Sequence, residues 1–280
     1  MAEVIASVEH AAQWVSRESR PPAEWNPVYR ALVDEPGPVP AGAPDAAGLD
    51  EAGVDLVLRQ LTAPALLVVA VTDGEVTDSE LTDGQVTDGE RTRRLRIGLD
   101  PAGATVERAE GDRPSRWTEI DVQAVPATIT ALLEDAGVDL APPQLAVQHS
   151  EDALRLTPEQ NRLAHAALAR GLPAEEAFAS VPDLDDSLRD ALTATGPRLS
   201  LALTLHDPHG RVTQEPVTWS RLWARGSRGL YRLDQPTTPA LEVHPVLGGD
   251  VLGTLLPVLE QGLRFAAACA VSDDAPGGAQ

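Results

Sequence analysis

Two stretches of the chain decide the fold: EIDVQAVPATITALLEDAG at residues 119–137 and ALEVHPVLGGDVLGTLLPVLEQG at residues 240–262. Each begins with alternating apolar and polar residues, which favour a half-buried strand. Each continues through a short break that contains Pro or Gly into a Leu-rich segment with helical spacing. Because the same order occurs twice in one chain, we interpret these stretches as the ends of two similar halves.

The segments that precede these stretches repeat in the same order. Each half is predicted to begin with a helix, continue with three or four antiparallel strands and close with a helix. In the first half these segments are residues 48–62, 65–71, 91–99, 104–110, 117–125 and 126–137. In the second half they are residues 183–196, 198–207, 218–226, 229–235, 240–246 and 249–267.

This order predicts an α+β fold with two pseudo-repeated halves of antiparallel sheet and helix. A sheet needs a cover for its apolar face, and helices supply it. Joining the two halves edge to edge into one central sheet would remove two exposed edges.

The rest of the chain divides around these halves. Residues 1–47 are expected to hold an N-terminal helix at 4–16 and a Pro-rich segment. The first half covers 48–148, a small helical insert covers 149–182, the second half covers 183–268, and a disordered tail is expected at 269–280. The insert opens with Thr157 and Gln160 at capping-box spacing, with Pro158 at the first helical position.

An acidic repeat interrupts the first half. Residues 71–90 read VTDGE, VTDSE, LTDGQ and VTDGE, and such consecutive turns cannot form a packed core element. Calcium loops place their ligands at alternate residues around one turn, which a five-residue period does not do. We therefore expect a flexible loop at residues 72–90 between two strands.

Composition excludes several classes of function. The net charge of −21, with no Lys and 22 basic residues, argues against binding to nucleic acid or to an anionic membrane. The single Cys269 excludes an internal disulfide and a multi-Cys metal site. The N-terminus lacks the pattern of a signal peptide, and polar residues interrupt the apolar segment 251–271, so we expect a cytoplasmic protein with an amphipathic helix there.

No assembled active site is recognisable. The string RGSRG at 225–229 is not a nucleophile elbow, and no phosphate-binding Gly motif is present. His206 and His209 flank a turn, and His244 lies at an alternate position of a predicted strand, before Pro245, where we expect a satisfied interior or edge histidine. We interpret Asp183, Asp185 and Asp186 as helix-capping residues. The sequence therefore predicts no enzyme, no catalytic residue, no cofactor and no metal.

Trp219 and Trp223 are four residues apart on a predicted strand, so both face the same side of the sheet. If the two side chains are exposed, they would be interface anchors. If they are buried, they would pack in the core. Together with Thr72 and Glu90, the two ends of the repeat loop, they are the candidate partner-binding residues.

Several strings resemble the EspG family, the secretion-associated proteins of mycobacterial type VII (ESX) systems. They are GLDEAGVDLVLRQLTAPALLVVAV (48–71), VTWSRLWARGSRGLYRL (217–233) with ALEVHPVLGGDVLGTLLPVL (240–259), and LTPEQNRLAHAALARGLPAEEAF (156–178). The resemblance covers residues 48–268, whereas 1–47 and the repeat loop depart from the family.

The resemblance implies a cytoplasmic chaperone that binds a PE–PPE heterodimer, covers the apolar tip of the PPE protein and keeps it soluble until export. Binding would use the sheet face, the loop at 72–90 and the helical insert. The alternative is a small-molecule binder or an unrecognised enzyme that uses the cleft between the halves and one or more of His206, His209 and His244.

Overall fold

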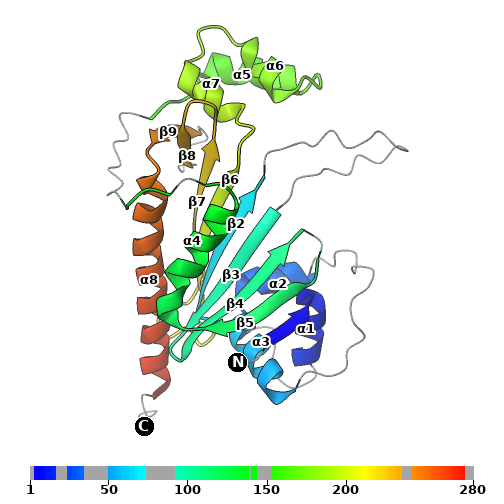
Figure 1. The fold of residues 1–280 in the computed structure, drawn as a ribbon, viewed down its shortest axis with the longest axis vertical. Coiled ribbons are helices and arrows are strands. Elements are labelled where there is room, and N and C mark those ends of the chain that lie inside the picture. The colour runs from blue at the N-terminus through cyan, green and yellow to red at the C-terminus, as the bar shows by residue number, and fades with distance from the viewer. Residues whose placement is uncertain are drawn as a thin grey trace, which may run out of the picture.

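A computed structural model describes residues 3–16, 24–34, 50–73, 92–111, 113–138, 140–143, 153–234 and 241–274. Its centre is one antiparallel sheet of nine strands in the order β1-β5-β4-β3-β2-β6-β7-β8-β9, with helices on both faces (Figure 1). The strands are β1 Glu3–Ala6, β2 Ala65–Thr72, β3 Thr92–Asp100, β4 Gly103–Glu110, β5 Ser115–Ile120, β6 Arg198–Leu205, β7 Val217–Arg225, β8 Leu230–Asp234 and β9 Glu242–Val246.

Eight α-helices accompany the sheet in the described part of the chain. They are α1 Val8–Ser16, α2 Pro27–Asp34, α3 Glu51–Leu61, α4 Val125–Asp135, α5 Pro158–Leu168, α6 Ala174–Ala179, α7 Asp186–Leu192 and α8 Gly249–Asp274. The capping box predicted for the insert is formed at the start of α5, where Thr157 and Gln160 bond to each other's backbone.

The predicted α+β fold with two similar halves is confirmed. One half runs α3, β2, β3, β4, β5, α4, and the other runs α7, β6, β7, β8, β9, α8. The halves join edge to edge through β2 and β6, which pair antiparallel from Ala65 opposite Leu205 to Thr72 opposite Arg198. The sheet is therefore continuous through the join, and the first strand of each half becomes a central strand.

The two faces of the sheet are covered differently (Figure 1). On one face, α4 and α8 lie over the alternate apolar side chains of β2, β3 and β6 and form the main core. On the opposite face, α1, α2 and α3 cover the end of the sheet that contains β1, β5 and β4 around Trp25, Tyr29 and Trp117. The helices α5, α6 and α7 cover β8 and β9 at the other end of that face.

The N-terminal prediction was wrong in part. Residues 3–6 form the edge strand β1 instead of the first turn of a helix, and the helix begins at Val8. Strand β1 pairs with β5, and the indole Nε1–H of Trp117 donates to the carbonyl oxygen of Ala6 at 3.1 Å. A partner strand that is more than 100 residues away in the sequence outweighs the local helical pattern.

Two boundaries also differ from the predictions. The fourth strand of the first half ends at Ile120, and a short 3₁₀ turn at Val122–Ala124 leads into α4. The closing helix α8 continues to Asp274, so residues 269–274 of the predicted disordered tail are helical. The predicted loop at 72–90 lies outside the described residues apart from Thr72 and Asp73.

Among the described helices, α8 is long and apolar enough to cross a membrane by length and composition. About a third of the residues in its apolar window are buried in this chain. These include Val251, Leu255, Val258 and Leu259, which pack in the main core.

The close approach of α3 to β3 generates a first prediction. A Cβ at Gly98 would lie 2.7 Å from Oγ1 of Thr105 and 2.9 Å from Cβ of Ala63, whereas a Cβ at Gly229 would meet nothing within 4 Å. We expect Gly98→Ala to lower the free energy of unfolding by about 1–3 kcal/mol through overpacking. Gly229→Ala should change it little. Equal denaturation midpoints for the two variants would contradict this packing.

Candidate partner-binding surface

The two predicted tryptophans lie on the same side of β7, as expected, but in different surroundings. Trp223 is fully buried in the main core, and its indole Nε1–H donates to Oδ2 of Asp250 at 2.8 Å. Trp219 is half-buried at the margin of that core, where the Arg221 guanidinium lies 5.2 Å from its ring centroid. Trp223 therefore takes the packing role that was the alternative to an interface anchor.

Of the two predicted loop residues, Thr72 is described and Glu90 lies outside the described residues. Thr72 ends β2, is half-buried, and its hydroxyl lies 3.2 Å from that of Thr92 on β3. Its side chain points to the sheet face opposite α8, because it alternates with the core residue Val71. Thr72 thus closes the β2–β3 ladder at the base of the repeat loop.

The three histidines are not brought together. His206 and His209 flank the turn after β6, and His209 lines a cavity of about 260 Å³ together with Cys269. Burial alone would raise the pKa of Asp207 in this turn, but N–H groups of Val212 and His209 hydrogen-bond to its carboxylate and lower the pKa. Within the described ranges no three His, Cys, Asp or Glu side chains form a group that could hold a metal.

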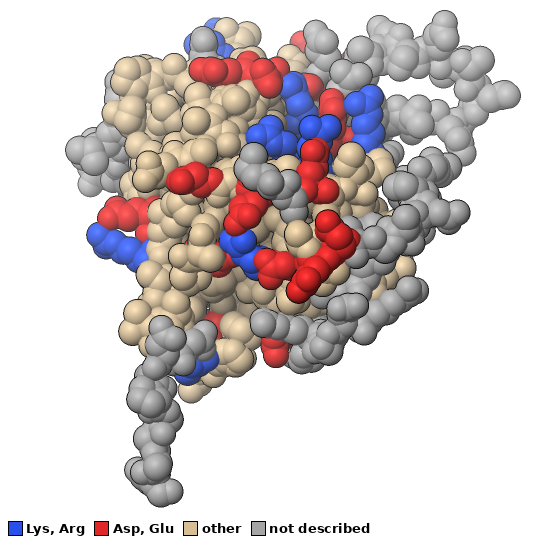
Figure 2. Space-filling model, turned by 60° about the horizontal axis from the view of Figure 1, so that its bottom comes forward, with Lys and Arg blue, Asp and Glu red and all other residues tan. Residues whose placement is uncertain are grey.

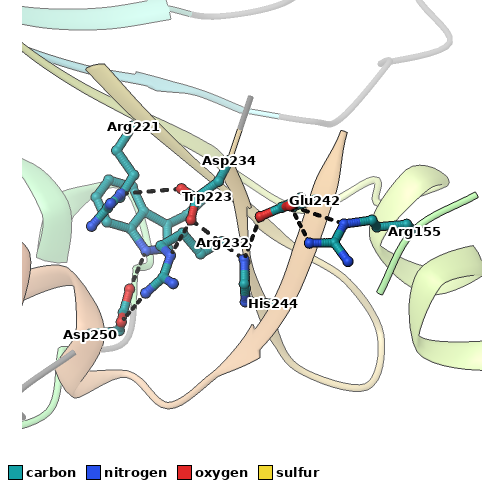
Figure 3. A network of polar contacts seen from close by, with 8 residues as sticks. All are labelled: Arg155, Arg221, Trp223, Arg232, Asp234, Glu242, His244 and Asp250. Carbon is teal, nitrogen blue, oxygen red and sulfur yellow. Dashed lines mark hydrogen bonds and ion pairs between the residues drawn. The ribbon is translucent and has the colours of Figure 1, made fainter. Parts of the chain in front are cut away.

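His244 belongs to a polar network across β7, β8 and β9 (Figure 3). Arg232 donates to Asp250 at 2.9 Å and to Asp234 at 3.0 Å, and Asp234 also pairs with Arg221 at 3.2 Å. Nε2 of His244 lies 3.5 Å from Asp234 and 3.7 Å from Glu242, which also pairs with Arg155.

We interpret this network as part of the fold, because its acidic and basic side chains form ion pairs with one another. The side chains of Arg232 and Asp250 are only 3% and 8% exposed. A buried ion pair of this kind needs every partner in place, since a lone buried charge is costly. The network joins the first turn of α8 to β7 and β8.

A second set of contacts attaches α7, the first helix of the second half, to the sheet. Asp190 on α7 accepts hydrogen bonds from the backbone N–H and the hydroxyl of Ser227, from the N–H of Arg228 and from the hydroxyl of Tyr231. Burial would raise the pKa of Asp190, but these donors outweigh it and lower the pKa. A Cβ at Gly226 would overlap the Asp190 carboxylate, so the β7–β8 turn needs Gly there.

The sheet face opposite α8 is open in its centre, between the two groups of helices. The residues that point to this face on β2, β6 and β7 stand in cross-strand rows, with Val68 opposite Ala202 and Ala202 opposite Ser220. All are half-buried or exposed, although they lie on central strands. We name this surface the open strip: Val68, Ala70, Ser200, Ala202, Thr218, Ser220 and Leu222. Val68 lies at its margin, where it packs against the cluster under α1, α2 and α3.

The open strip was not predicted residue by residue. Its side chains are small, so a partner could approach the backbone of the central strands closely, and Leu222 is 36% exposed. The period-two alternation of β2 and β6 shows which residues share a face. Nothing local in the sequence shows that no described helix covers this part of the face.

The net charge of the chain is −21. On the face drawn in Figure 2, acidic and basic side chains are interspersed among uncharged ones. Such a surface supports solubility and carries no single-sign field for a polyanion.

Comparison with protein families and with curated proteins finds no match. Among solved structures, the chain is similar to the Mycobacterium tuberculosis type VII secretion system chaperone EspG5, whose structure was solved in complex with a PE25–PPE41 dimer. The two share 13% sequence identity with a TM-score of 0.47, over 100% of this chain and 99% of that one. A likeness at this level carries no argument about function.

The buried network predicts that Asp250→Asn destabilises the chain strongly. The substitution removes one of the two ion pairs of the buried Arg232, the one beside Trp223, and we expect a loss of about 3 kcal/mol in the free energy of unfolding. Glu260→Gln is the control, because Glu260 forms an exposed ion pair with Arg264 worth at most about 0.5 kcal/mol. Urea denaturation measures both, and a small loss for Asp250→Asn would show that the network is dispensable.

The contacts of Asp190 predict a pH-dependent contribution to stability. A lowered pKa means that the stabilisation is present above the unfolded pKa and is lost as pH falls through the folded one. At pH 7 we expect Asp190→Asn to cost about 1 kcal/mol, allowing for partial exposure. The difference in the free energy of unfolding between Asp190→Asn and wild type should disappear as pH falls below about 4. Asp186→Asn, which touches only exposed ion pairs, should change stability little at either pH, and a pH-independent gap for Asp190→Asn would contradict the assignment.

Proposed function

We propose that this chain is a cytoplasmic chaperone of type VII (ESX) secretion that binds a PE–PPE-type heterodimer and keeps it soluble before export. The sequence strings at 48–71, 156–178 and 217–259 that resemble the EspG family support the proposal. The fold agrees with what that resemblance implies, namely an α+β protein with a central antiparallel sheet and a small helical group beside it.

The open strip is the observation that carries the proposal. Antiparallel sheets are often solvated on one face, but their outward residues are then mostly polar. Here Val68, Ala70, Ala202 and Leu222 alternate with small hydroxyl side chains at the centre of a nine-stranded sheet. Groups of helices flank the strip on both sides, so an extended or helical segment of a partner could lie between them.

The rest of the described surface suits a chaperone. Its many charges oppose self-association, while the mixed apolar strip offers a place for a partner's apolar residues. Binding requires no catalytic group, and the polar side chains in the network of Figure 3 are engaged with one another in stabilising the fold.

The direct experiment is co-expression of this chain with each PE–PPE pair encoded in its genome, followed by size-exclusion chromatography. A stable complex that elutes ahead of either component is the expected result. Failure of every encoded pair to co-elute would refute the proposed function.

A substitution in the open strip should separate binding from folding. Ser220 is exposed at the centre of the strip, so Ser220→Arg should leave the fold intact and place a long charged side chain where a partner's apolar segment would lie. We expect at least about a hundredfold loss of affinity for the PE–PPE pair, which corresponds to about 3 kcal/mol.

The matched control is Gln261→Arg, which adds the same side chain at an exposed position on α8. It should bind the pair as wild type does, with an unchanged unfolding temperature in both variants. If the control loses binding and Ser220→Arg does not, the binding surface lies on the α8 side.

A further inference from the structure

The β3 segment TRRLRI places three arginines on two faces of the sheet, and each meets a different environment. Arg93 points to the α4 side, where it pairs with Asp73 at 2.9 Å and donates to the carbonyl oxygen of Asp135. Arg94 and Arg96 point to the opposite face, in the rows of Ala70 and Val68. Arg94 therefore borders the open strip directly, in the row Arg94, Ala70, Ser200, Leu222.

Arg96 is fully compensated inside the protein. Its guanidinium pairs with Glu107 at 2.5 Å and lies 5.8 Å from the centroid of the Tyr29 ring. Glu107 also accepts hydrogen bonds from Tyr29 and Ser115, both at 2.8 Å. These contacts engage the Glu107 carboxylate directly, whereas Arg94 feels its negative charge without a hydrogen bond or ion pair to it.

Arg94, in contrast, makes no hydrogen bond or ion pair with any described residue, although it is half-buried. Burial and the nearby positive charge of Arg96 lower its pKa, and the negative charge of Glu107 opposes this shift in part. A partly desolvated guanidinium that forms no ion pair within the described ranges costs free energy in the folded chain. The chain holds this cation at the edge of a surface that no described helix covers.

The charge of the surrounding face has the same sign. On this face of β2, β3, β6 and β7, the described acid is Asp100, which lies at the far end of β3 and pairs with Arg59 at 2.9 Å. Arg198 is exposed on β6, one row beyond Arg94. On the neighbouring strand β4 this face also holds Glu107, which pairs with Arg96.

We infer that Arg94 is a specificity-determining residue of the open strip, and that the partner segment bound there presents a carboxylate to it beside apolar side chains. This inference rests on the proposed function and adds the charge of the partner's contact. The planar guanidinium binds a carboxylate through two parallel hydrogen bonds, which a neutral partner cannot replace. Binding would thus give Arg94 a direct counter-ion and select against partners that lack the acid.

The test compares four purified chains: wild type, Arg94→Gln, Arg94→Lys and the control Arg108→Gln. Arg108 is exposed on the neighbouring strand β4 and points to the other face of the sheet. The probe is the PE–PPE pair that co-elutes with wild type. Affinities are measured by calorimetry at low and at high salt, and unfolding temperatures are measured without the probe.

We expect Arg94→Gln to weaken binding by about tenfold or more, Arg94→Lys to lose less, and Arg108→Gln to stay within about twofold of wild type. The difference between wild type and Arg94→Gln should shrink at high salt. The unfolding temperature of Arg94→Gln should be equal to or above that of wild type, because the substitution removes a half-buried charge that forms no ion pair with a described residue.

Two results would overturn the inference. If Arg94→Gln binds the pair as wild type does while Ser220→Arg does not, the strip binds without the carboxylate contact, and the proposed function stands. If Arg94→Gln unfolds at a clearly lower temperature, Arg94 serves the fold of the free chain. Absence of any complex with wild type is a separate result, which refutes the proposed function and this inference with it.

Discussion

The pairing of β2 with β6 is the constraint on which the rest of the structure depends. It joins the sheets of the two halves, and it turns two edge strands into the centre of a nine-stranded sheet. Val69 and Leu201, which are opposite each other, then contribute to one core under α4 and α8. Without this pairing, each half would expose an apolar edge and half of that core.

The same join creates the open strip. The pseudo-repeat places α3 and its neighbours over one end of the opposite face and α7 with the insert over the other end. The centre of that face, along β2, β6 and β7, is left to side chains such as Ala202 and Ser220. A binding surface at the junction of two similar halves is therefore a consequence of how they join.

The sequence predicted the parts of the fold that local patterns specify. The apolar run of β2, the alternation of β6 and the Leu-rich closing helices indicated the elements, and their repeated order indicated the two halves. The edge strand β1 was missed because its four residues carry no signal stronger than the helical pattern after them. What makes it a strand is the contact with Trp117 on β5, which is distant in the sequence.

The candidate site was harder to predict than the fold. Large aromatic residues such as Trp223 are the first candidates for a binding surface in a sequence, yet this ring is buried beside Asp250. The open strip consists of small residues, and its exposure depends on which helices cover which face. Arg94 cannot be distinguished from Arg93 and Arg96 in a run of arginines until the pairing of β3 shows that the other two have acidic partners.

The central claim is that a protein partner lies on the open strip. Photo-crosslinking tests it most directly, with a benzophenone side chain placed at Ser220 in the strip or at Leu256 on the exposed side of α8. In complexes with a PE–PPE pair, the account predicts a crosslink to the partner from position 220 and none from position 256. A crosslink from position 256 alone would contradict it and would place the partner on the other face of the sheet.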